Sequence, residues 1–343
     1  MGLNSPGKDI LSPVDILKTE IDENVYYHGI YWNDYEHVRK YNNRMSTGNE
    51  SVVWWESLLS GNRGPFHHAL IINCGNGWVE RDLFLHRVID EATGIDISAE
   101  LLSEAEEEAR KGNLPIRYYL HDANSQDPLP QGDWDLILNF AALHHVAYID
   151  RFLRKIANRC GSCLFVNMDY VGPHRNQYPK KLWAKAQAVN LQLPEQIRQN
   201  FKYPHIPTMI KADPSEAIHS ELIQTHIERY FSWEWKQNLG GAIAYLILTH
   251  NHQFYDSQME QKSDILDFLV QEDYHFTMKH PETTLFLYAG ARVKGEIPEE
   301  NLIEYTKVEE EREGEARKNG GMYYPQTDVS IESYGDFGFQ LRD

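Results

Sequence analysis

The sequence lacks any long apolar run. A helix that spans a bilayer needs about 20 consecutive apolar residues, and the longest candidate, at residues 240–249, is too short. The first residues also lack the basic stretch and apolar segment of a secretory signal, and Pro6 stands where N-myristoylation prefers Ser or Thr. We therefore expect a cytoplasmic protein that makes no membrane contact.

Cysteine is scarce, with three residues in 343, too few for a disulfide framework. Cys160 and Cys163 form an isolated Cys-Gly-Ser-Cys motif before an apolar run, with no second cysteine pair elsewhere. Such a motif is compatible with redox activity or with half of a zinc site, but its place in a turn favours a structural role. We expect no bound metal.

Positive charge is also in deficit, because 33 Lys and Arg residues face 51 Asp and Glu residues, for a net charge of −18. Binding to nucleic acids depends on neutralising phosphates, so a nucleic-acid partner is not expected. Hydrophobic residues make up 41% and aromatic residues 12% of the chain, which is typical of a globular protein.

Strand-like and helix-like segments alternate between residues 66 and 170. Apolar runs predict strands at 70–73, 92–96, 116–121, 135–139 and 162–168, and periodic segments predict helices at 79–88, 99–111 and 147–158. Two late strands, at 231–239 and 283–293, would complete the sheet. The pattern predicts an α/β fold with a doubly wound, mostly parallel seven-stranded sheet, whose ligands bind at the carboxyl ends of the strands.

The chain divides into five predicted segments. An aromatic-rich helical cap or lid, with a helix at 52–59, precedes the ligand-binding core, and a proline-punctuated helical insertion that includes a helix at 180–191 follows it. The late strand pair carries helices at 241–251 and 263–270, and the acidic run of the charged tail is expected to be a solvated face. The boundaries are 1–65, 66–170, 171–230, 231–294 and 295–343.

A glycine turn, Asn73-Cys74-Gly75-Asn76-Gly77, follows the first strand, and Asp96 ends the second strand about twenty residues later. This spacing is typical of a nucleoside-type ligand whose ribose is held by the acid. Glu80 replaces the third glycine of the dinucleotide motif, and a carboxylate there disfavours a diphosphate. A dehydrogenase is therefore disfavoured, and a cofactor with a sulfonium and an amino acid suits the site better.

With this order of motifs, the region resembles the class I S-adenosylmethionine-dependent methyltransferases. The resemblance implies that residues 73–77 approach the methionine part of S-adenosylmethionine, and that the polypeptide around the next two strand ends holds the nucleoside. In that scheme Asp96 binds the ribose beside Ile97, Asp122 and Ala123 receive the adenine, and the segment holding Asn139 and Ala141 faces the reacting methyl group. The chain departs from the family at Asn73, where many members carry an acid, and at Trp78, where a small residue is usual.

Three histidines are candidate general bases. Methyl transfer from a sulfonium is an in-line displacement, and an oxygen acceptor must also lose a proton, which a histidine accepts well near neutral pH. His144 and His145 follow the fourth strand, and His174 follows the fifth. A purely structural role remains open for each of them.

The acceptor is predicted less directly. The segments 169–178, 213–218 and 239–241 resemble a subgroup associated with glycan or natural-product modification, which implies a small-molecule or glycan hydroxyl. Asn139 is not followed by the prolines of amino-methylating DNA enzymes, and Asn139 with Asp169 is an incomplete ligand set for magnesium. A protein or peptide methyltransferase and a non-catalytic cofactor-binding scaffold remain as alternatives, and the oligomeric state is left open.

Overall fold

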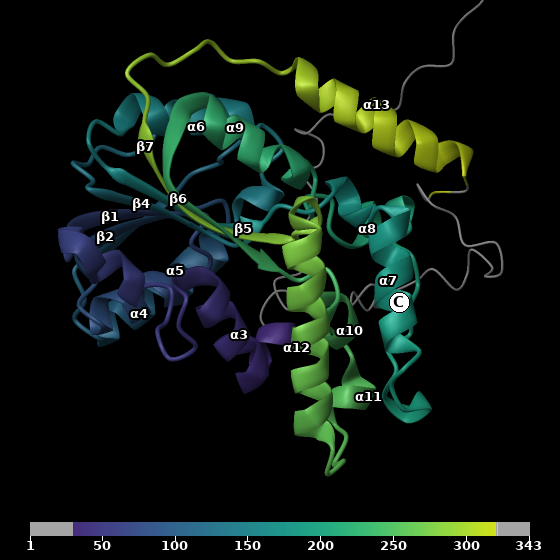
Figure 1. Ribbon diagram of the computed structural model, residues 1–343. Helices are drawn as coiled ribbons and strands as arrows, with labels where there is room; N and C mark the ends of the chain where they lie inside the picture. Colours follow the sequence, from purple (N-terminus) through teal and green to yellow (C-terminus); the bar gives the residue numbers. More distant parts are fainter. Residues whose placement is uncertain (1–29, 320, 322–343) are drawn as a thin grey trace, which may run out of the picture.

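A computed structural model describes residues 30–319 and 321, so the first part of the expected cap and the end of the tail lie outside the described residues. Its centre is one seven-stranded sheet of order β3-β2-β1-β4-β5-β7-β6 (Figure 1). Among the described strands, β7 runs in the opposite direction to the other six. The predicted fold class is confirmed. The strands are β1 (Phe66–Ile72), β2 (Ile89–Asp96), β3 (Ile116–Leu120), β4 (Leu136–Phe140), β5 (Leu164–Tyr170), β6 (Phe231–Gly240) and β7 (Phe286–Val293).

Helices cover both faces of the sheet because its central strands are apolar on both sides. Ile71 and Leu138 belong to the core that contains α4 (Trp78–Leu85) and α5 (Ala99–Lys111). Leu70 and Ile137 belong to the opposite core, with α6 (Ile149–Arg159) and α9 (Ile223–Tyr230). The strand order reverses between β1 and β4, which places the binding crevice at their carboxyl ends.

The described part of the cap packs against late helices. Its elements are η1 (Trp32–Asp34), α3 (Glu36–Thr47) and the 3₁₀ segment η2 (Glu56–Asn62), so the helix predicted at 52–59 is wrong in type and position. Tyr41 of α3 donates a 2.7 Å hydrogen bond to the buried carboxylate of Asp273. Asp273 also accepts from the backbone amides of Gly241, Ile243 and Ala244, and thereby fastens the cap to the turn after β6.

The late helices differ from their predicted bounds. The turn at Gly240 and Gly241, where both residues have positive φ, delays α10 (Ala244–Leu248), which is much shorter than predicted. Asn251 then caps the separate short helix α11 (His252–Tyr255) through a hydrogen bond from the amide of Phe254. The next helix, α12 (Lys262–Lys279), is more than twice the predicted length. The glycine turn and the Asn251 cap thus divide the segment for which the sequence predicts one helix at 241–251.

The insertion between β5 and β6 contains short helices and irregular turns. They are η4 (His174–Asn176), α7 (Lys180–Asn190), η5 (Glu195–Ile197), α8 (Ile206–Ala212) and η6 (Ser220–Leu222). None of the helices in the described ranges combines the length and apolar character needed to cross a membrane. Cys160 and Cys163, both buried, are paired in a disulfide at the turn into β5.

The acidic tail contains a packed helix, α13 (Ile303–Lys318), coloured yellow in Figure 1. Tyr305, Val308 and Ala316 are buried, so the helix is held by apolar contacts. Acids on its inner side contact three histidines of the insertion and α9: the pairs are His174–Glu313, His219–Glu309 and His226–Glu304. The expectation of a simply solvated acidic face is wrong for this side of the helix.

Candidate active site

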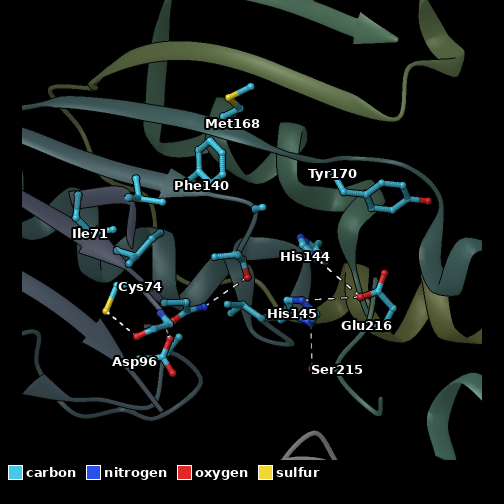
Figure 2. Close-up of a pocket in the computed structure, with 18 of the residues that line it drawn as sticks. Ile71, Cys74, Asp96, Phe140, His144, His145, Met168, Tyr170, Ser215 and Glu216 are labelled. Carbon is cyan, nitrogen blue, oxygen red and sulfur yellow. Dashed lines mark hydrogen bonds and ion pairs between the residues drawn. The ribbon is translucent and has the colours of Figure 1, made fainter. Parts of the chain in front are cut away.

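A cavity of about 1000 Å³ lies at the carboxyl ends of the strands. Figure 2 shows Asp96 and Cys74 toward one end, and His144, His145, Glu216 and Tyr170 toward the other. The first end is built by the turns after β1 and β2, and the second by the turn after β4, the end of β5 and the insertion. After the ligands that the sequence predicts for them, we call these the nucleoside end and the acceptor end.

Asp96 is buried where β2 ends, and backbone amides fix its carboxylate. Its Oδ2 accepts a 2.8 Å hydrogen bond from the amide of Gly75, and its Oδ1 accepts a 2.9 Å bond from the amide of Ser98. Burial raises the pKa of Asp96, although these amide bonds oppose the rise. Ser98 also caps α5 by accepting a hydrogen bond from the amide of Leu101.

The glycine turn has left-handed backbone angles at Asn73, Gly75 and Gly77, with φ of +48°, +56° and +75°. Asparagine is one of the few other residues that tolerates this region. A Cβ atom on Gly77 would lie 2.4 Å from the hydroxyl of Tyr118, so helix α4 approaches β3 too closely for a side chain there. Glu80 in the first turn of α4 is fully buried, and burial raises its pKa to about 7.

Most of the predicted cofactor residues come together at the cavity wall. Asp122 lies after β3 and accepts a 2.8 Å hydrogen bond from the amide of Asn124. The predicted residues that line the cavity are Asn73, Cys74, Gly75, Asp96, Ile97, Asp122, Ala123 and Ala141. Asn76, Gly77 and Asn139 are not among the lining residues.

Asn139 is instead fully buried behind the acceptor end, where it orients Asp169. Its Nδ2 donates 2.7 Å hydrogen bonds to Oδ1 of Asn167 and Oδ2 of Asp169. Asp169, which is also buried, accepts from the amide of Leu143 at 2.8 Å and lies 2.6 Å from Nδ1 of His144. Burial opposes protonation of His144, but the charge and hydrogen bond of Asp169 raise its pKa to about 9.

His145 is held by a second chain of hydrogen bonds. Its Nδ1 lies 3.1 Å from Oγ of Ser215, which donates a 2.7 Å bond to Oδ1 of the buried Asp213. The rings of His144 and His145 are 4.0 Å apart, and both Nε2 atoms lie 3.8 Å from Oε2 of Glu216. Burial, followed by the charge of His144, lowers the pKa of His145.

Arg175 places the loop that carries Ser215 and Glu216. Its guanidinium is fully buried and donates to the carbonyl oxygens of Pro214 at 2.6 Å and Glu216 at 3.1 Å. Its own amide donates to the carbonyl of Ala217 at 2.8 Å. Arg175 and Ala217 both have positive φ, a strained conformation for these residues. The surrounding contacts thus impose the path of this loop.

The third candidate base, His174, does not line the cavity. It is fully buried, and its Nε2 lies 2.9 Å from Oε1 of Glu313 on α13. Burial lowers the pKa of His174. These surroundings favour a structural role.

Several lining residues were not predicted. Glu216 and Asn176 come from the irregular insertion, where no periodic pattern indicates which side chains face inward. The remaining unpredicted acceptor-end residues are mostly aromatic or apolar, and a sequence does not separate them from core positions: they include Trp32, Phe140, Met168, Tyr170, Tyr245 and Phe286.

Residues 70–160 match the protein family described as "Methyltransferase domain". No curated protein matches the chain in sequence. The chain contains a methyltransferase domain with a class I, Rossmann-like fold, and it is a methyltransferase whose methyl donor is S-adenosylmethionine.

Solved structures of similar fold have low sequence identity. One is an S-adenosylmethionine-dependent methyltransferase of Mesorhizobium loti, with 18% identity, 70% of this chain and 96% of that chain covered, and a TM-score of 0.41. A second, the geranyl diphosphate C-methyltransferase of Streptomyces coelicolor, has 12% identity, coverages of 70% and 78%, and a TM-score of 0.42. A third, a phosphoethanolamine N-methyltransferase 2 of Haemonchus contortus, has 15% identity, coverages of 84% and 61%, and a TM-score of 0.45. Similarity at this level gives no information on the acceptor.

Proposed function

We propose that this methyltransferase methylates a hydroxyl group of a small molecule or sugar, with a histidine as general base. The observation that carries the proposal is the position of the His144–His145 pair at the end of the cavity away from Asp96. A donor at the nucleoside end and an acceptor in front of the histidines would share one cavity, so the two reactants would be aligned for displacement.

The cofactor would occupy the nucleoside end. Asp96 would accept hydrogen bonds from the ribose hydroxyls, since each of its oxygens already accepts one amide bond and retains another lone pair. Asp122 would accept from the adenine amino group, and the glycine turn would approach the methionine part. Ala141, exposed to the cavity after β4, would lie beside the reacting methyl group.

The acceptor end suits a small, partly polar molecule. Tyr170, Tyr245 and Phe286 contribute aromatic surface, and their rings pack against one another. Asn176 adds a polar atom, because its Oδ1 is buried with no hydrogen-bond partner. A cavity of about 1000 Å³ that must also hold the cofactor leaves room for a small acceptor.

His145 is the better placed base. The Ser215 hydroxyl donates its hydrogen bond to the carboxylate of Asp213, so Oγ of Ser215 accepts from Nδ1–H of His145, and the lone pair of the neutral ring lies on Nε2. The acceptor oxygen would attack the methyl carbon as the carbon–sulfur bond breaks, and Nε2 would take the hydroxyl proton. S-adenosylhomocysteine and the methyl ether are the products.

The test uses S-adenosylmethionine labelled in its methyl group, incubated with the full chain and a cell extract. Label in a small-molecule product supports the proposal, whereas label only in macromolecules overturns it in favour of a protein or peptide acceptor. Retained cofactor binding with no methylated product overturns it in favour of a binding scaffold.

The assignment of the base is tested on the product so found. His145→Gln is expected to lower kcat at least 100-fold with unchanged cofactor affinity, because general-base catalysis typically contributes about 10²–10⁴-fold. His67→Gln is the matched control, since this histidine is exposed in β1. Equal kcat in the two variants would rule out His145 as the base.

A further inference from the structure

We propose that His144, His145 and Glu216 bind a divalent transition-metal ion at the acceptor end of the cavity. The proposal rests on the proposed function in one respect, because the ion would face the same acceptor oxygen. Each of the three residues offers one possible ligand atom, and these atoms all lie within 4.8 Å of one another. Among the described residues, this is the only group of three or more His, Cys, Asp or Glu side chains that meets that condition.

The three ligand atoms converge without bonding directly. Nε2 of His144 and Nε2 of His145 each lie 3.8 Å from Oε2 of Glu216, which is too long for a hydrogen bond. Two ligands of a tetrahedral ion at about 2.1 Å from the metal lie about 3.4 Å apart. Each of these two separations therefore needs to shorten by about 0.4 Å for one ion to bind both atoms, and the ligand atoms of the two histidines lie within 4.8 Å of each other.

The hydrogen-bond partners of the two Nδ1 atoms orient both histidines for metal binding. Metal-binding histidines usually donate their second N–H to a carboxylate or another acceptor, which fixes the tautomer and the ring orientation. Nδ1 of His144 meets Asp169 at 2.6 Å, and Nδ1 of His145 meets Ser215, which is itself bonded to Asp213. Both arrangements leave Nε2 as the ligand atom on the side of Glu216.

The surrounding charge favours a cation. Asp169 and Asp213 are buried, and the side chain of Glu216 is 15% exposed, so three carboxylates surround the two imidazoles. Arg175 contributes one positive charge nearby, and it contacts the loop of Glu216 through carbonyl oxygens. A divalent ion would offset the remaining negative charge.

The ligand types select the class of ion. Two imidazoles and one carboxylate suit Zn²⁺, Fe²⁺ or Mn²⁺, whereas Mg²⁺ and Ca²⁺ prefer oxygen ligands. All three residues line the cavity, so the open coordination positions would face the acceptor. Three protein ligands with an open position are typical of catalytic rather than structural metal sites.

In the metal-bound chain the ion, rather than His145, would activate the acceptor hydroxyl, because the ion occupies the Nε2 lone pair that the base needs; His145 acts as the base in the metal-free chain. An acceptor hydroxyl bound to the ion would lose its proton to bulk water, since a divalent metal lowers the pKa of a bound O–H group. The resulting alkoxide would attack the methyl carbon of S-adenosylmethionine as the carbon–sulfur bond breaks. The ion would keep its oxidation state throughout.

The test is calorimetric titration of the chelator-treated full chain with Zn²⁺ and, separately, with Mn²⁺. We expect one ion per chain, and Glu216→Gln and His145→Asn should each weaken binding at least 10- to 100-fold. With Co²⁺ as a probe, the absorption bands of bound ion should be lost in the same variants. His67→Gln is the matched control, because His67 forms a surface group with Asp90 and Glu91, and it should leave binding unchanged.

The thermal unfolding midpoint of each apo variant shows whether it folds, and Glu216→Asp, which keeps the carboxylate, should restore part of the affinity. Absence of binding to the folded wild-type chain, or equal binding by Glu216→Gln, overturns the metal site. If methylation then continues in chelator, the proposed function stands without the metal. If the ion binds but no small molecule is methylated, the proposed function fails and the metal site stands.

Discussion

The carboxylate of Asp96 and the amide of Gly75 are joined by a 2.8 Å hydrogen bond that connects the end of β2 to the turn after β1. This bond fixes the acid against the glycine turn, so two parts of the predicted cofactor site hold each other in place. The amide of Gly75 has a hydrogen-bond acceptor in Asp96, and the same bond fixes the orientation of the carboxylate before any ligand binds. The nucleoside end is therefore preorganised by the backbone.

Replacement of Asp96 by Ala should weaken binding of S-adenosylmethionine and S-adenosylhomocysteine at least 100-fold. In the proposed placement of the cofactor, the ribose hydroxyls donate two hydrogen bonds to this charged acceptor, each worth about 1.5–3 kcal/mol, and the variant would lose both. Calorimetry measures both affinities. Asp90→Ala is the matched control, because Asp90 is an exposed acid of the same strand. Unchanged affinity in Asp96→Ala would contradict this placement of the ribose.

Replacement of Asp122 by Ala should have a smaller effect, about 10-fold on each ligand, because in the proposed placement the variant would lose one hydrogen bond, which the adenine amino group donates. The losses should be equal for S-adenosylmethionine and S-adenosylhomocysteine, since both carry adenine. Asp127→Ala, an exposed acid of the same loop, serves as control. A loss confined to S-adenosylmethionine would place Asp122 near the sulfonium instead.

The sequence predicts the nucleoside end better than the acceptor end for a physical reason. Asp96 and Asp122 follow regular strands, and parallel strands bring their carboxyl ends to one edge. Glu216 lies on a loop whose path depends on the buried guanidinium of Arg175 and on a strained Ala217. Tertiary contacts of this kind leave no periodic signal in the sequence.

Replacement of Asp169 by Asn should lower kcat about 10- to 100-fold and leave cofactor affinity unchanged. The amide keeps an oxygen acceptor but loses the charge that holds Nδ1–H of His144, and loss of such a partner typically has this magnitude. Steady-state kinetics and calorimetry on one preparation separate the two effects. Asp133→Asn, at an exposed position, is the control. An intact kcat would show that the orientation of His144 does not matter.

Replacement of Glu80 by Gln should stabilise the protein at alkaline pH. Burial raises the pKa of Glu80 from 4.5 to about 7, so the folded state resists its ionisation. The contribution of Glu80 to the free energy of unfolding is fully present below pH 4.5, where the carboxyl is neutral in both states. It is lost as pH rises through 7, by about 3 kcal/mol in all. Denaturant unfolding at pH 5 and pH 8 should therefore show a gain for Glu80→Gln at pH 8 only. An equal gain at both values would assign the effect to packing.

Packing of α13 should weaken in acid. Burial lowers the pKa of His174, so the folded state resists its protonation, and this contribution to stability is lost as pH falls below 6.5. Burial would raise the pKa of Glu313, but the hydrogen bond and charge of His174 lower it, so protonation of this acid also destabilises the contact. Protonation of His174 and protonation of Glu313 therefore both destabilise the folded state as pH falls. Hydrogen exchange of residues 303–318, corrected for intrinsic rates, should be faster at pH 5.5 than at pH 7.5.

The variant His174→Asn separates this contact from general acid sensitivity. It removes the titrating ring, so the difference in α13 protection between the two pH values should shrink. Glu311→Gln is the matched control, since Glu311 lies exposed on the same helix and pairs only weakly with Lys307 at 4.0 Å. If both variants keep the full pH dependence of the wild-type chain, the His174–Glu313 contact does not control how α13 packs. His226, whose pKa burial also lowers, would then be the next residue to replace, because it faces Glu304 near the start of the same helix.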